Sequence, residues 1–141
     1  MSQISPDSAL SEAAAEGSLP PEVLRGIRLF NARRFDEAHH VLQAVWCREA
    51  GPIRLLYQGI IQVGAAAIHV NRGHMAQALV LFDRARPKLA ELPPVCRGVR
   101  VARFREAAAR CEAEVRAAGE GVGGPCPDGE FPTVEVGGDA S

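Results

Sequence analysis

The chain has 141 residues, of which 47% are hydrophobic, and its formal net charge is −1. This length suits one domain. The near-neutral charge gives no electrostatic case for a nucleic-acid partner, since phosphate-binding domains usually have a strongly basic face. The arginines between Arg97 and Arg116 are a local exception, which we interpret as a solvated helix face balanced by Glu106, Glu112 and Glu114. We therefore expect a single domain without a nucleic-acid partner.

The two ends of the chain differ in composition from its centre. Residues 1–18 are rich in Ser, Ala and Glu, and residues 119–141 are rich in Gly and Pro. Such segments bury too little apolar surface to offset their ordering entropy. We expect a disordered or weakly helical tail over 1–18, a single all-helical domain over 19–118 and a disordered tail over 119–141, with neither tail required for folding.

Start and stop signals divide the centre into helices. Proline at Pro20-Pro21 suits a helix start, and Gly51-Pro52 and Pro93-Pro94 each interrupt the chain. No stretch alternates with period two over a convincing length. The sequence predicts an all-α fold, a compact bundle of about five helices over residues 20–31, 34–49, 52–71, 74–90 and 95–118.

A faint internal repeat has a spacing of forty residues. Asn31, Phe35, Ala38 and Leu42 recur as Asn71, Met75, Ala78 and Phe82. Each copy places a polar turn before a helix with a small and then a large inner residue, as in stacked helical hairpins. Coincidence and common descent both explain two copies, so the repeat serves only to favour antiparallel hairpins.

The expected third helix is apolar from Ile53 to Val70, which raises the question of a membrane span. Four polar residues interrupt this run, so a buried core helix is the better interpretation and no membrane contact is expected. On a helical wheel the four fall within about 80° of one another. This stripe is either a narrow solvent-facing edge or an internal line that partners must satisfy; its members are Arg54, Gln58, Gln62 and His69.

The second helix presents a core face that contains Trp46. His39 and Gln43, one turn apart, lie at the edge of this face, whereas Glu37 points to the opposite side and His40 lies between. Because the turn at 51–52 is short, we expect the second and third helices to be antiparallel neighbours.

Counting outward from Gly51 places His39 level with Gln62, and Gln43 level with Gln58. Arg54 then lies about 12 Å from Gln62 in one direction along the helix, and His69 lies about 10 Å away in the other. We call these six residues (His39, Gln43, Gln58, Gln62, Arg54 and His69) the polar seam. The candidate site is the polar seam together with Glu37 and Trp46, and no catalytic residue is assigned.

The four cysteines show neither a C-x-x-C pair nor metal-finger spacing. The simplest interpretation of the cysteines is that they are thiols of a protein in the reducing cytosol. The N-terminus also lacks the pattern of a secretory signal. We therefore expect a cytoplasmic protein, and we predict no metal and no cofactor. The cysteines are Cys47, Cys96, Cys111 and Cys126.

Three stretches of the chain resemble the domain of unknown function 309 (DUF309) family, small helical proteins of bacteria and archaea. The family signature E-A-H-E-x-L-E-x-x-W is matched by Glu37, Ala38, His39, Leu42 and Trp46. A following helix of the form R-x-x-L-Q-G-L-I-Q is matched by Arg54, Gln58, Gly59, Ile61 and Gln62, and an H-x-x-x-G turn by His69 and Gly73. The resemblance covers about residues 24–89 and implies a fold and candidate positions, but no reaction.

Two positions depart from the family pattern. Where the family tends to have glutamates, this chain has His40 and Gln43. If the family motif binds a metal or performs acid–base chemistry, the loss of two carboxylates removes anionic ligands and the most obvious general bases.

Three hypotheses for the function remain open, and the sequence leans away from an enzyme. A non-catalytic binding module would present Tyr57, Arg54 and the faces beside His40 and Glu37 to a protein, a peptide or a small ligand. A small metal-assisted or histidine-based hydrolase would use His39, His40 and His69. In a structural interpretation, the inner side chains of the polar seam form mutual hydrogen bonds that fix helix register.

Overall fold

The computed structural model of the protein describes residues 18–119 and 131–137. Within these ranges the predicted all-α fold is confirmed, with five helices and one very small sheet. The elements are α2 (Pro21–Asn31), α3 (Phe35–Arg48), α4 (Arg54–Asn71), α5 (Met75–Ala90), β1 (Val95–Cys96), β2 (Val99–Arg100) and α6 (Val101–Gly119). The predicted N-terminal tail lies outside the described residues, apart from Ser18.

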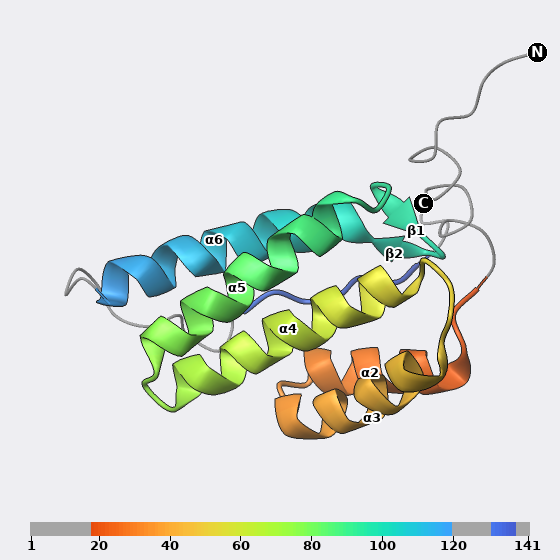
Figure 1. Ribbon diagram of the computed structural model, residues 1–141, viewed down its shortest axis with the longest axis horizontal. Helices are drawn as coiled ribbons and strands as arrows, with labels where there is room; N and C mark the ends of the chain where they lie inside the picture. The colour runs from red at the N-terminus through yellow and green to blue at the C-terminus, as the bar shows by residue number, and fades with distance from the viewer. Residues whose placement is uncertain (1–17, 120–130, 138–141) are drawn as a thin grey trace, which may run out of the picture.

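The helices stack in the order in which they occur in the chain. Each helix packs against the next one, from α2 through to α6. Figure 1 shows α4, α5 and α6 side by side, with α2 and α3 paired on one side of α4. Two antiparallel hairpins, α2–α3 and α4–α5, are thus followed by α6, as the sequence predicts.

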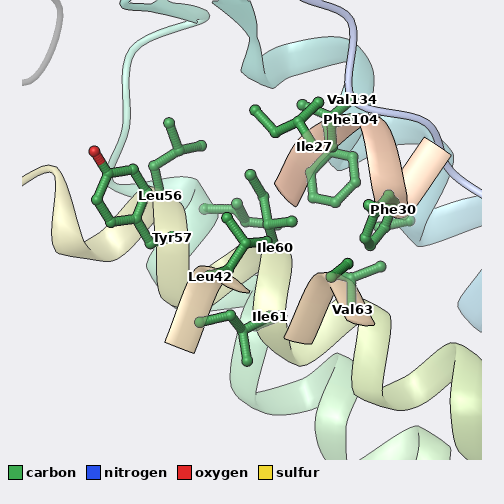
Figure 2. Close-up of a cluster of buried hydrophobic side chains, with 14 of the residues drawn as sticks. Ile27, Phe30, Leu42, Leu56, Tyr57, Ile60, Ile61, Val63, Phe104 and Val134 are labelled. Carbon is green, nitrogen blue, oxygen red and sulfur yellow. The ribbon is translucent and has the colours of Figure 1, made fainter. Parts of the chain in front are cut away.

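Helix α4 lies at the centre of the hydrophobic core. Its Leu56, Ile60 and Val63 are at most 1% exposed, which agrees with the prediction of a buried core helix. Among the described helices none is long and apolar enough to cross a membrane. Figure 2 shows the side chains that gather around α4 from the other elements: Ile27, Phe30, Leu42, Phe104 and Val134.

The two hairpin turns have the same backbone geometry forty residues apart. In the first, the amides of Arg33 and Arg34 donate to the carbonyls of Phe30 and Leu29. In the second, Gly73 and His74 donate in the same way to the carbonyls of Val70 and His69. This is the Schellman pattern, which places one residue in the left-handed region. Arg33 (φ 68°) and Gly73 (φ 79°) occupy that position.

The prediction for residues 95–100 is wrong, because the last helix begins only at Val101. Val95 and Cys96 pair with Arg100 and Val99 in an antiparallel hairpin instead. Arg97 and Gly98, the two residues of its turn, both have positive φ, 50° and 86°. A turn with two such residues matches the twist of paired strands, so this hairpin outcompetes the first helical turns.

Residues 131–137 form an extended segment on the core, although the sequence predicts disorder throughout 119–141. Phe131 and Val134 are 3% and 2% exposed. The side-chain amide of Asn31 both donates to the Val134 carbonyl and accepts from its amide. Two buried apolar side chains are enough to place a short segment whose surroundings are rich in Gly and Pro. Residues 120–130 and 138–141 lie outside the described residues.

Candidate functional site

Glu37 stands apart from the rest of the candidate site. Its carboxylate forms an ion pair with Arg34, 2.5 Å between Nε and Oε1, and both side chains are more than half exposed. The pair spans the first turn of α3 on the solvent side. An exposed ion pair of this kind contributes little to stability. Its position agrees with the helical wheel, which turns Glu37 away from His39.

Trp46 and Arg54 meet at one end of the polar seam. The guanidinium carbon of Arg54 lies 4.3 Å from the centroid of the Trp46 ring, which is a cation–π arrangement. Both side chains are half-buried, because α3 and α4 approach each other at the 49–53 connection. The indole Nε1 and the Arg54 Nε are buried, and neither has a hydrogen-bond partner in the described parts of the chain.

The three glutamines lie along the middle of the polar seam. Gln43, Gln58 and Gln62 are all half-buried. Among the residues that the structure describes, their side chains make one hydrogen bond, a weak contact from Gln43 Nε2 to the sulfur of Cys47 at 3.9 Å. The side-chain oxygen of Gln62 is buried without a partner. Within residues 18–119, no side-chain hydrogen bond joins His39 to a glutamine of the polar seam or one of these glutamines to another. The side chains therefore lack the mutual bonding that a register-fixing network requires.

The other end of the polar seam is a hollow rich in histidine. His39 and His40 of α3 face His69 of α4 across a surface hollow of about 430 Å³. The His69 ring also lies 5.8 Å from that of His74, so all four histidines of the chain gather here. We call this the histidine hollow; its lining residues are Asp36, His39, His40, Ala65, Ile68, His69 and Arg72.

The hollow joins His39 to the part of α4 that follows Gln62. Counting outward from Gly51 places His39 level with Gln62, and the hollow that His39 lines also contains Ala65, Ile68 and His69, one to two turns further along α4. His39 and His69 therefore share one hollow.

Sequence reasoning missed Asp36 and Arg72 as members of the histidine hollow. Asp36 lies one turn before His39 and His40 on α3, and Arg72 lies one turn after His69. The i, i+3 and i, i+4 rows could have found them. Nδ1 of His69 is buried and has no hydrogen-bond partner among the described residues.

Tyr57 is not an exposed contact residue, contrary to the sequence prediction. Its side chain is fully buried, and its hydroxyl has no hydrogen-bond partner in the described ranges. Figure 2 shows the oxygen pointing away from the other labelled side chains. Burial raises the pKa of Tyr57 to about 12, and the nearby carboxylate of Glu49 acts in the same direction.

The chemistry available at the polar seam is hydrogen bonding more than metal binding. No group of three or more His, Cys, Asp or Glu side chains within the described ranges is placed to hold a metal ion. By contrast, six buried side-chain atoms in these ranges lack a hydrogen-bond partner, and four of them lie along the α3–α4 contact. They belong to Trp46, Arg54, Gln62 and His69.

The candidate site lies in a part of the chain that matches a known family. Residues 23–81 match a family described as Domain of unknown function (DUF309). The matched region runs from α2 through α3 and α4 into the first half of α5, and so contains the whole candidate site. A search of curated proteins finds no match for the chain. The chain is thus similar to the DUF309 family over residues 23–81.

Proposed function

We propose that the protein is a non-catalytic binding module and that the polar seam, with Trp46, is the surface that contacts its partner. The observation that supports this proposal is the line of four buried polar atoms without partners along α3 and α4. Buried polar groups in proteins are nearly always hydrogen-bonded. Several buried polar atoms without partners along one helix–helix contact are typical of a surface whose hydrogen bonds are completed by a binding partner.

The energetics favour a partner that supplies hydrogen-bonding groups. Each buried group without a partner costs about 1–3 kcal/mol. The Trp46 indole and the Arg54 guanidinium offer N–H donors, so this end favours carbonyl or carboxylate oxygens. The Gln62 oxygen is an acceptor and favours an N–H group. A peptide backbone carries both kinds of group, and small rotations of the half-buried side chains would expose the atoms to it.

A peptide library tests this proposal directly. Random peptides are selected on the full chain, and the selected peptides are then measured against Gln62→Met and Trp46→Phe. Gln62→Met removes the amide group, with its unpartnered oxygen, at nearly constant shape, and Trp46→Phe removes the unpartnered indole N–H together with part of the ring. We expect at least about tenfold weaker binding, the equivalent of one lost hydrogen bond of about 1.4 kcal/mol.

The matched control is Glu37→Gln, which changes an exposed charge on the same helix but outside the polar seam. It should leave binding of the selected peptides unchanged. Peptides that bind equally well to the wild type and to both seam variants would show that the polar seam is not the contact surface.

A hydrolase is the alternative, and the histidine hollow is the observation that favours it. His39, His40 and His69 line the hollow with Asp36, which brings possible bases and one carboxylate together. The test is hydrolysis of nitrophenyl acetate and nitrophenyl phosphate, with and without added Zn²⁺ or Mn²⁺. A rate that His39→Ala and His69→Ala both abolish would support this function, and a rate that neither changes would exclude it.

A further inference from the structure

The extended segment 131–137 is held through its main chain, as a bound peptide would be. Asn31 makes two hydrogen bonds to Val134, 2.9 Å to its carbonyl and 2.8 Å from its amide. Arg33 donates from Nη2 to the carbonyl of Phe131 (2.8 Å) and from Nη1 to that of Pro132 (3.1 Å). The Arg100 amide donates to the Glu135 carbonyl at 2.9 Å. Main-chain hydrogen bonds of this kind give affinity in the recognition of extended peptides.

Some side chains of the segment are buried as anchors, and others are exposed to solvent. Phe131 packs edge-on against Phe35, with ring centroids 5.7 Å apart, and Val134 is also buried. Thr133 between them is exposed. The Glu135 carboxylate pairs with Arg103 of α6 at 3.0 Å. In a peptide groove, pockets for some side chains of the peptide give specificity, while its other side chains face solvent.

The walls of this groove come from parts of the chain far from the segment. Asn31 ends α2, Arg33 lies in the α2–α3 turn, and Arg100 and Arg103 belong to β2 and α6. A single β-bridge, Val99 to Val136, joins the segment to the sheet. The sequence separation at the Asn31 clamp is 103 residues. Figure 1 shows the segment running behind α4 and α5.

We propose that this groove is a peptide-binding site in its own right, and that residues 131–137 occupy it as an internal competitor. The ligand is an extended segment of a partner protein that presents an aromatic residue, an aliphatic residue three positions later and then an acidic residue, as Phe131, Val134 and Glu135 do. Apart from Phe35 at the start of α3, this groove is formed by elements outside the α3–α4 contact, and it contains no residue of the polar seam. The inference therefore does not depend on the function proposed for the polar seam.

A partner peptide must displace the internal segment before it can bind the groove. Because the segment belongs to the same chain as the groove, it competes with an external peptide as an intramolecular ligand. The apparent affinity for an external peptide is reduced by the fraction of molecules in which the groove is open. Weakening the internal segment should therefore strengthen binding of an external one, whereas weakening the groove should abolish it.

A labelled peptide with the sequence of residues 131–137 is the probe, and its binding is followed by fluorescence polarisation. The full chain is compared with the double variant Phe131→Ala, Val134→Ala, whose groove walls are intact. We expect the peptide to bind the double variant at least about tenfold more tightly than the wild type. Equal binding to both proteins, or binding to neither while both retain their helical circular dichroism, would overturn the proposal.

The repeat provides a matched control for the groove. Asn31→Ala in the double variant removes the clamp and should reduce peptide binding at least about tenfold. Asn71→Ala changes the equivalent residue of the second turn, which is exposed, and should leave binding unchanged. Equal effects of the two substitutions would contradict the assignment of the groove.

A second experiment avoids destabilising substitutions. A protease site is inserted between residues 124 and 125, and the folded protein is cleaved there without other changes. We expect the labelled peptide to replace the cleaved fragment while the helical circular dichroism is retained. Absence of exchange, or exchange that occurs only with loss of the helical signal, would show that the segment is an integral part of the core and would overturn the proposal.

Discussion

Replacement of Tyr57 by phenylalanine should stabilise this protein. The side chain is fully buried, and its hydroxyl has no hydrogen-bond partner within the described residues. A buried hydroxyl in this situation costs about 1–3 kcal/mol, which phenylalanine avoids at almost the same volume. We therefore expect the free energy of unfolding at neutral pH to rise by about 1–3 kcal/mol in Tyr57→Phe.

The same hydroxyl gives the stability a pH dependence with a definite sign. The pKa of Tyr57 is raised from 10.0 to about 12, first by burial and then by Glu49. The folded state thus holds this proton more tightly than the unfolded state does, so stability is complete below pH 10 and falls as the pH rises toward 12. At 1.36 kcal/mol for each pKa unit, the loss is about 3 kcal/mol.

Two measurements check these expectations. Urea unfolding followed by circular dichroism gives the free energy of unfolding, and the difference between variant and wild type should widen above pH 10. Burial also raises the pKa of Cys96, to about 11, but this thiol is present in both proteins and cancels in the difference. Tyr57 is the one tyrosine of the chain, so tyrosinate absorbance reports its pKa alone.

The reasoning would be refuted by either of two results. A native tyrosinate midpoint near 10 would show that the hydroxyl is solvated. A variant that is destabilised by more than about 0.5 kcal/mol at neutral pH would show that the hydroxyl makes a favourable hydrogen bond.

Three further predictions follow from the packing, each checked by urea unfolding. Phe131→Ala should cost about 3–5 kcal/mol, as for other buried phenylalanines, whereas Thr133→Ala in the same segment should stay within about 0.5 kcal/mol; equal effects would contradict the burial of Phe131. Glu112→Gln removes the carboxylate that accepts from Arg86 and Arg116, whose side chains are 53% exposed. The cost should be about 1 kcal/mol, shrinking at high salt, and an effect independent of salt would count against an ionic origin. Gly59→Ala places a Cβ 2.5 Å from Leu89 Cδ2, so it should lower the free energy of unfolding by about 1–3 kcal/mol through overpacking. Combining it with Leu89→Ala should partly relieve this overpacking. Additive losses in the double variant would contradict the contact.

The helices could be predicted because their boundaries are marked by local signals. Pro20-Pro21 and Gly51-Pro52 lie within three residues of the helix ends that they define. The hairpin at 95–100 was missed because its short signal, Gly98 between Val95 and Val99, lies directly before an Arg- and Ala-rich helix. Phe131 and Val134 were missed because composition averages a whole segment, and a rich background of Gly and Pro conceals two anchors. The alternation of Thr133, Val134, Glu135 and Val136 is the strand-like signal that could have revealed them.

The candidate site could be predicted in its membership more than in its geometry. Wheel positions depend only on the helical period, so Glu37 was correctly directed away from His39. Register depends on the 49–53 connection, which the helical pattern does not encode, so residue counting alone did not show that His39 lines one hollow with His69. Hydrogen bonding among the glutamines depends on ångström-scale side-chain placement, which lies beyond any reasoning from spacing.

The two equivalent turns show how a repeated unit can serve two different purposes. A residue other than glycine in the left-handed region costs about 1–2 kcal/mol, and Gly73 avoids this cost in the second turn. Arg33 bears it in the first turn, where it donates two hydrogen bonds to the segment 131–137 and lies over the Phe131 ring. Hydrogen bonds from a charged group contribute about 1.5–3 kcal/mol each, which is enough to offset the strain while the segment is bound. The first turn is thus adapted to hold an extended segment, whereas His69 and His74 flank the second turn and place the histidines beside the polar seam. One backbone geometry, used twice, supports the peptide groove at one position and borders the histidine hollow at the other.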